Sequence, residues 1–172
     1  PTGAGKTTII KSILRSIKPD SGQIIVDNMD ISLFTDIDLN YYRRNIGMVF
    51  QDFKLLSDRT IFENIALPLQ IIGSNTDLIK DRVKKILVKI GLNNKNDAFP
   101  EELSGGEQQK VCVARALVKN PKIIVADEPT GNLDPSSSDD IIDLLEEESK
   151  LGTTIIMATH NYPLIENRIE HF

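Results

Sequence analysis

The feature that most constrains this chain is a glycine-rich stretch at its beginning, followed by a lysine and two threonines. Residues Pro1–Thr8 fit the phosphate-binding pattern G-x-x-x-x-G-K-[ST] from its second position onward. Glycines let the backbone approach phosphate closely, and N–H groups at a helix start bind anions. Lys6 would bring a positive charge to the β- and γ-phosphates, and Thr7 would bring a hydroxyl ligand for Mg²⁺. The residues predicted to bind nucleotide are Thr2, Gly3, Ala4, Gly5, Lys6, Thr7 and Thr8.

The alternative for this stretch is an ordinary glycine-rich turn before a helix. Isoleucines and a leucine follow at helical spacing over residues 9–17, which favours a loop that opens a helix. The first glycine of the pattern would precede Pro1, and the chain stops at Phe172 without a terminating signal. We therefore expect a single domain that is truncated at both ends.

Composition narrows the class of protein. The chain has 172 residues, of which 40% are hydrophobic, enough for the core of one domain. A net charge of −5 argues against general nucleic-acid binding, because phosphate contacts need a basic surface. Cys112 is the single cysteine, which fits a reducing compartment, and we expect it to be a buried small residue. No apolar run approaches the ~20 residues of a membrane span.

Apolar runs of strand length alternate with helical patterns along the chain. Strands are predicted at Gln23–Asp27, Ile46–Phe50, Ile123–Ala126 and Thr153–Ala158. Helices are predicted at 6–16, 60–72, 79–90 and 106–118, and after the N-cap pair Asp134–Pro135. This order predicts an α/β fold, with mostly parallel strands flanked by helices and an inserted helical segment. Pro68 is expected to kink or divide the second of these helices.

Two acidic residues follow the buried strand that begins at Ile123. Asp127 and Glu128 would stand at its carboxyl end, where open α/β sheets place ligand chemistry. One carboxylate there suits a role at Mg²⁺, and the next can orient or deprotonate a water molecule. The alternative is a pair of ordinary loop acids, which the upstream phosphate pattern makes the weaker interpretation.

A second glycine-containing segment, Leu103–Gln109, precedes the predicted helix at 106–118. Ser104 and Glu107 fit a capping box, so helix capping is the alternative to a binding role. Capping does not require Gly105 and Gly106, which are poor helix formers. A hydroxyl and free N–H groups at a helix start would also form an anion site. A nucleotide bound at a single phosphate loop does not require this second anion site, so the segment needs another explanation.

The segment made of Leu103, Ser104, Gly105, Gly106, Glu107 and Gln108 resembles the signature of the ATP-binding-cassette (ABC) ATPases. In that family two domains dimerise head to tail, and each signature closes on ATP held by the phosphate loop of the other domain. The resemblance implies a homodimer with ATP and Mg²⁺ as cofactors. It also implies an α/β core at residues 1–52 and 122–172 and a helical signature subdomain at 53–121.

Further family motifs occur in the expected order along the whole chain. By resemblance, the catalytic residues are Glu128 as base, His160 as switch histidine and Gln51 of the Q-loop. The Mg²⁺ ligands implied are Thr7, Gln51 and Asp127, and the D-loop at the dimer contact comprises Asn132, Leu133 and Asp134. The alternative for His160 is an ordinary surface or capping histidine. His171 has no comparable context and stays unassigned.

One segment is similar to the bacterial cell-division members of the family. Asp58-Arg59-Thr60 is its most telling part. That resemblance implies a permease-like membrane subunit that docks in a groove near Asp52–Thr60, and contacts with other divisome proteins. It implies a peripheral position on the cytoplasmic face of the plasma membrane, with no direct binding of nucleic acid.

Two alternatives within the family remain. One is the ATPase of a lipoprotein-release or macrolide-export transporter, which shares the motif Ala126–Asp134. The other is a soluble ATPase that acts on nucleic acid or the ribosome. Lys6 and Ser104 are only 98 residues apart, which leaves no room for the long coiled coil of the DNA-repair members.

Overall fold

A three-stranded parallel sheet forms the centre of the molecule. The computed structural model describes residues 5–166 and 168, so the predicted binding residues Thr2, Gly3 and Ala4 and the unassigned His171 lie outside the described residues. The strands are β3 (Ile46–Phe50), β4 (Ile123–Asp127) and β5 (Thr154–Ala158), in the spatial order β3-β4-β5. Both pairings are parallel. The predicted α/β fold with a parallel sheet is therefore confirmed.

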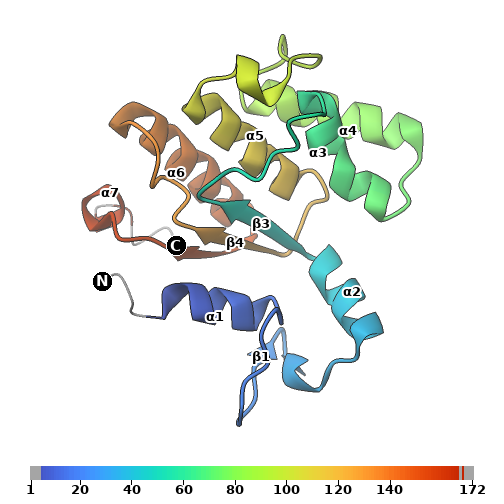
Figure 1. Cartoon of the computed structure of the whole chain (residues 1–172), viewed down its shortest axis with the longest axis vertical. Helices are drawn as coiled ribbons and strands as arrows, with labels where there is room; N and C mark the ends of the chain where they lie inside the picture. The colour runs from blue at the N-terminus through green and yellow to red at the C-terminus, as the bar shows by residue number, and fades with distance from the viewer. Residues whose placement is uncertain (1–4, 167, 169–172) are drawn as a thin grey trace.

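Helices cover both faces of this sheet. Figure 1 shows α1 (Lys6–Ile13) on one face, and α5 (Gly105–Leu117) and α6 (Pro135–Lys150) on the other. The alternation of side chains along β4 explains the two layers. Val125 packs with Ile10 of α1 in one buried cluster, whereas Ile124 and Ala126 pack with α5 and α6 in another. All three β4 residues are fully buried, as the continuous apolar run predicts for a strand covered on both faces.

The inserted helices pack on the outer side of α5 (Figure 1). They are α3 (Ile61–Ile71) and α4 (Thr76–Lys89), and with α5 they enclose a separate apolar cluster. The predicted stripe of α4 is buried at Ile79, Val83, Leu87 and Ile90. Pro68 lies inside α3, which continues across it, so the helix is not divided, and the alternative expectation of a kink stays a prediction. The proline removes only the one backbone bond that an N–H at this position would donate, and the apolar packing of α3 retains the helix.

Helix α5 belongs to two cores at once. Val111 and Ala114 face the helical cluster, whereas Cys112, Val113 and Ala116 face the sheet. Cys112 is fully buried, as expected for a small apolar side chain. The division into a core (1–52 and 122–172) and a helical subdomain (53–121) stays a prediction, because this one helix packs in both parts.

Several short elements differ from the sequence prediction. The strand predicted at Gln23–Asp27 is a hairpin of two short strands, β1 (Ile25–Val26) and β2 (Met29–Asp30). Its turn residues have φ of 50° and 60°, as tight hairpin turns require. Four elements were not predicted from the sequence. They are the helices α2 (Asp36–Arg44) and α7 (Tyr162–Glu166) and the 3₁₀ turns η1 (Ile31–Leu33) and η2 (Pro100–Glu102).

Helix starts in this chain are fixed by polar caps. Capping boxes join Thr35 to Asp38 before α2, Thr60 to Glu63 before α3, and Ser104 to Glu107 before α5. Asp134 caps α6 by accepting from the Ser137 N–H at 3.0 Å, with Pro135 in the first turn, as predicted. Among the residues that the structure describes, no helix is long and apolar enough to cross a bilayer.

Candidate functional site: carboxylates at the end of the central strand

The backbone of Glu128 turns sharply where β4 ends. Glu128 has a positive φ of 47°, a conformation that costs energy for a residue with a side chain. Its N–H donates to the Ala158 carbonyl at 2.7 Å, which ties this turn to the end of β5. The strained turn therefore holds the Glu128 side chain at the carboxyl edge of the sheet.

The Glu128 carboxylate contacts the side chains of two residues from other segments, Lys6 and His160. Lys6 Nζ lies 3.5 Å from Oε1, and His160 Nδ1 lies 2.8 Å from Oε2. The His160 backbone N–H also donates to Oε2 at 3.1 Å. The Glu128 side chain is 16% exposed, whereas the His160 side chain is 63% exposed. The structure thus brings together three predicted site residues that are up to 154 positions apart in the sequence.

Asp127 stands one residue earlier, beside the first turn of α1. Burial raises the pKa of Asp127, and the neighbouring charge of Glu128 raises it further. A side-chain hydrogen bond from Thr7 opposes this shift by stabilising the carboxylate. A carboxylate and a hydroxyl in contact are hard oxygen donors of the kind that Mg²⁺ prefers.

A metal at this position would draw few ligands from the protein. Within residues 5–166 and 168, no group of three or more His, Cys, Asp or Glu side chains could hold a metal ion. Mg²⁺ at nucleotide sites usually takes one or two protein ligands and completes its shell with phosphate and water. The pair Thr7 and Asp127 fits that mode of binding.

The start of α1 directs backbone N–H donors that have no intrahelical acceptor toward the same region. The first intrahelical bond of α1 runs from the Ile9 N–H to the Gly5 carbonyl, at 2.9 Å. The N–H groups of Lys6, Thr7 and Thr8 precede it and therefore have no helical acceptor. Gly5 has a φ of +82°, which a glycine adopts without strain. Backbone donors, a lysine and the positive end of the helix dipole converge here, as anion binding requires.

Gln51 and the predicted D-loop form a second group of contacts. Asn132 Nδ2 donates to the Gln51 carbonyl at 3.1 Å, and Gln51 Nε2 donates to Asn132 Oδ1 at 3.4 Å. A Cβ on Gly131 would lie 2.8 Å from Gln51 Nε2, so a larger residue at this position would displace the Gln51 side chain. No hydrogen bond joins Gln51 to Thr7 or Asp127 among the described residues. The role of Gln51 as a Mg²⁺ ligand stays a prediction.

The signature segment begins helix α5 with a capping box. Helix capping was the alternative interpretation of this segment from the sequence. The Ser104 N–H donates to Glu107 Oε2 at 2.8 Å, and the Glu107 N–H donates to Ser104 Oγ at 3.3 Å. The backbone bond at Ser104 lowers the pKa of Glu107. Gln108 Nε2 donates to the Leu103 carbonyl at 3.1 Å. No hydrogen bond or ion pair within the described chain joins this segment to Lys6, Glu128 or His160.

The two signature glycines have different reasons to be glycine. A Cβ on Gly106 would lie 2.5 Å from Ser137 Oγ, because α5 and α6 approach closely there. A Cβ on Gly105 would meet only ordinary contacts, with Leu133 and Phe53 atoms at 3.9 Å. Packing among the described residues therefore accounts for Gly106 but does not require a glycine at position 105.

Gln109 is a site residue that the sequence interpretation missed. Its side chain is fully buried and donates from Nε2 to the Pro129 carbonyl at 2.7 Å and the Phe50 carbonyl at 3.2 Å. Pro129 follows Glu128, and Phe50 precedes Gln51, so α5 is tied to the backbone beside both residues. Its Oε1 accepts no hydrogen bond from the part of the chain that the structure describes. A polar residue four positions before the buried Val113, on the apolar face of a helix, was the available signal.

Comparison with known proteins agrees with this geometry. Residues 1–131 match the family model described as ABC transporter. The chain belongs to this family and is an ATPase of the ABC class. The resemblance inferred from the signature is therefore confirmed.

Two curated relatives illustrate the range of the family. The cell division ATP-binding protein FtsE of Bacillus subtilis is 48% identical over 165 residues, which are 96% of this chain and 72% of the relative. The methionine import ATP-binding protein MetN of Photobacterium profundum is 45% identical over 166 residues, 96% of this chain and 48% of the relative. The chain is thus an FtsE-like ABC ATPase by sequence similarity.

Solved structures of one ABC cassette are also similar. A dimeric structure of a bacterial ABC transporter cassette has a TM-score of 0.86 and 35% identity, and covers 96% of this chain and 74% of the cassette. A dimeric post-hydrolysis state of the same cassette, bound to ADP and Pi, has a TM-score of 0.84 at 35% identity, and covers 95% and 73%. The P-loop ATPase fold is therefore shown as well as the family.

Proposed function

We propose that this chain is the ATP-hydrolysing subunit of an FtsE-type membrane complex. In this complex, an FtsX-like membrane subunit would use ATP turnover to control cell-wall hydrolases during cell division. The observation that carries the ATPase part is the Glu128 carboxylate, held at the end of β4 between Lys6 and His160. The identity with FtsE proteins supports the cell-division part.

The geometry supports a separate role for each of these residues around the γ-phosphate. Lys6 and the N–H groups of the first α1 turn bind the β- and γ-phosphates, and Glu128 accepts a hydrogen bond from the attacking water and orients it. His160 donates to oxygens on which charge develops. Thr7 and Asp127 would hold Mg²⁺, which when bound would neutralise phosphate charge. Because nucleotide needs Lys6, its arrival would release Lys6 from Glu128 and free the carboxylate for water.

The active species is proposed to be a homodimer with two composite sites. Ser104–Gly106 of one copy would contact the γ-phosphate held by the other copy, with Asn132, Leu133 and Asp134 at the contact. Gly105 supports this arrangement, because no atom of the described residues lies close enough to require a glycine there. The dimeric form of the similar cassette supports it too. ATP would then stabilise the closed dimer, and hydrolysis would release it.

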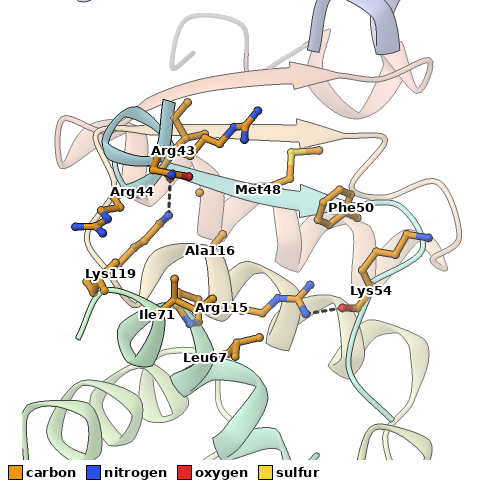
Figure 2. Close-up of a pocket in the computed structure, with 15 residues that line it drawn as sticks. Arg43, Arg44, Met48, Phe50, Lys54, Leu67, Ile71, Arg115, Ala116 and Lys119 are labelled. Carbon is orange, nitrogen blue, oxygen red and sulfur yellow. Dashed lines mark hydrogen bonds between the residues drawn. The ribbon is translucent and has the colours of Figure 1, made fainter. Parts of the chain in front are cut away.

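The membrane subunit is proposed to dock beside Asp52–Thr60, on the cytoplasmic face of the plasma membrane. A groove of about 550 Å³ lies there between α2, β3, α3 and α5 (Figure 2). Arg115 links it to the segment after Gln51, since its guanidinium donates to the Phe53 and Lys54 carbonyls at 2.6 and 2.5 Å. A displacement in the groove would reach Gln51 through this segment. Other divisome proteins are further proposed partners.

A second candidate is the ATPase subunit of a transporter, for lipoprotein release, macrolide export or small-molecule import. The 45% identity with a methionine import protein favours keeping it. The membrane subunit that binds the full-length protein distinguishes the two functions.

The test is co-expression of the full-length protein with the membrane subunits encoded in its own genome. We expect an FtsX-type subunit to co-purify, and the complex to hydrolyse ATP in vesicles. Co-purification with a lipoprotein-release permease but not with an FtsX-type subunit would refute the cell-division role. Unchanged hydrolysis in a complex that carries Glu128→Gln would refute the proposed catalytic base.

A further inference from the structure

The groove beside the Q-loop segment has an unusual distribution of charge. It is lined by cationic and apolar side chains and contains no aspartate or glutamate. Its cationic residues are Arg43, Arg44, Lys54, Arg115 and Lys119. Five of the 20 lysines and arginines therefore line this one groove, although the net charge of the chain is −5.

Four of these five cations are not neutralised by a carboxylate. Lys54 pairs with Asp52 at 2.6 Å. The structure gives Arg43, Arg44, Arg115 and Lys119 no ion pair with any acidic side chain of the described residues. They therefore place positive charge at the groove without compensation by the protein itself.

Neutral partners hold these cations in place. Arg43 donates to the Leu14 and Arg15 carbonyls at 3.0 and 3.1 Å. Lys119 Nζ donates to the Arg43 carbonyl at 3.0 Å, as the dashed line in Figure 2 shows. The Arg44 guanidinium lies over the Tyr41 ring, 4.9 Å from its centroid. Such contacts fix position and leave the charge unchanged, so the groove is preorganised for an anionic group.

The remaining lining is apolar and comes from both sides of the groove. Met48 and Phe50 of β3 and Leu67 and Ile71 of α3 all line the groove (Figure 2). The Ile71 side chain is 70% exposed, which is a large exposed fraction for an apolar side chain. Apolar surface with fixed cations at its edge matches an amphipathic segment that carries acidic residues.

Burial adds a cost that such a segment would remove. It lowers the pKa of Lys119 to about 8, because the ammonium is partly desolvated among Arg43, Arg44 and Arg115. A carboxylate beside Lys119 would favour its charged form again. Flat anionic membranes and nucleic acid fit less well, because the whole chain is acidic and the groove is concave and apolar.

We propose that this groove binds an amphipathic segment whose polar edge carries aspartate or glutamate, with Arg44 and Lys119 as its main cationic contacts. The inference rests on the proposed docking of a membrane subunit and adds the chemistry of the docking segment. Arg44 contacts Tyr41 and Lys119 donates to the Arg43 carbonyl, whereas the Glu128 carboxylate contacts Lys6 and His160.

Two fluorescent helical peptides test this proposal on the full-length protein. They share one apolar face, and one carries glutamates on its polar edge where the other carries lysines. We expect the glutamate peptide to bind at least tenfold more tightly, as measured by anisotropy. In the variant Arg44→Glu with Lys119→Gln this preference should disappear, and the lysine peptide should gain affinity, a reversal that misfolding cannot produce.

The matched control is Lys80→Glu with Lys84→Glu, two exposed lysines of α4 outside the groove. This control has the larger change of charge and should keep the preference for glutamate. Equal binding of the two peptides, or a preference that survives in the Arg44 and Lys119 variant, would overturn the inference. Competition by anionic vesicles or duplex DNA at the same residues would also overturn it.

ATP turnover and capture of the membrane subunit are measured on the same variants. Turnover should match wild type, which shows that the fold and the proposed catalytic function are intact. If wild type captures an FtsX-type subunit while the peptides bind equally, the charge inference fails and the proposed function stands. If the glutamate peptide is preferred while no membrane subunit is captured, the inference about the groove stands and the proposed partner fails.

Discussion

Glu128 and His160 meet at two points, since both the backbone N–H and Nδ1 of His160 contact the same carboxylate oxygen, at 3.1 and 2.8 Å. Oε1 of this carboxylate faces Lys6 at 3.5 Å. Both carboxylate oxygens that could orient a water molecule are therefore occupied by protein groups. In the proposed mechanism, phosphate would draw Lys6 and His160 away from this carboxylate before Glu128 orients water.

The first prediction concerns Glu128→Gln. The amide keeps the size of the side chain and removes the charge that orients water, so ATP binding should persist while turnover falls by about 10² to 10⁴-fold. Single-turnover hydrolysis and equilibrium binding measure the two effects separately. The ATP-bound variant should also accumulate as a dimer in size-exclusion chromatography. Near wild-type turnover would assign the base elsewhere.

Much of the core of this fold could be predicted from local pattern. The strands β3, β4 and β5 appear in the sequence as continuous apolar runs, and β4 is buried on both faces. The α4 stripe and the caps at Ser104 and Asp134 were equally predictable. Each of these signals depends on near neighbours in the sequence.

The missed elements depend on weaker signals. Helix α2 buries only Leu39 and Tyr42, so its sequence shows little periodicity. Its capping box uses Asp38 where glutamate or glutamine is usual. The β1–β2 hairpin has two-residue strands, too short for any alternation to appear.

The contacts of the site depend on the tertiary fold. Lys6, Glu128 and His160 could be named from motifs, but the salt bridge between Lys6 and Glu128 follows from the packing of α1 against the sheet. The pairing of Gln51 with Asn132 likewise joins loops that are 81 residues apart. No local pattern encodes these distances.

A second prediction concerns Asp127→Asn. Burial and Glu128 raise the pKa of Asp127, so its charge destabilises the folded state at neutral pH. The amide should therefore raise the melting temperature without nucleotide, while Mg²⁺-dependent turnover falls at least 10²-fold. Because the folded state binds the proton more tightly, this cost is absent below the unfolded pKa, grows between the unfolded and the folded pKa, and is constant above both. The stability advantage of the variant should thus shrink in acid, and a variant less stable than wild type at pH 7 would contradict this account.

A third prediction concerns Gln109→Met. Methionine has a similar size but cannot donate to the Phe50 and Pro129 carbonyls, and leaving buried carbonyls unpaired costs roughly 1–3 kcal/mol. The free energy of unfolding should fall by about that amount in a urea titration. Because Pro129 follows Glu128, turnover should fall more than nucleotide affinity. Gln108→Met is the control for stability, since Gln108 donates to the nearby Leu103 carbonyl and the free energy of unfolding should fall less.

The fourth prediction separates packing from catalysis at the two signature glycines. Gly106→Ala places a Cβ 2.5 Å from Ser137 Oγ, so it should destabilise the isolated chain by roughly 1–3 kcal/mol, and Ser137→Gly should restore part of that loss. Gly105→Ala meets no atom closer than 3.9 Å and gains helix propensity, so the isolated chain should be as stable as wild type or more stable. If Gly105 faces the nucleotide of a second copy, its methyl group should still lower ATP turnover and weaken the ATP-dependent dimer. Thermal melting and sedimentation of the full-length protein measure these quantities, and wild-type turnover in the Gly105 variant would argue against a composite site at the start of α5.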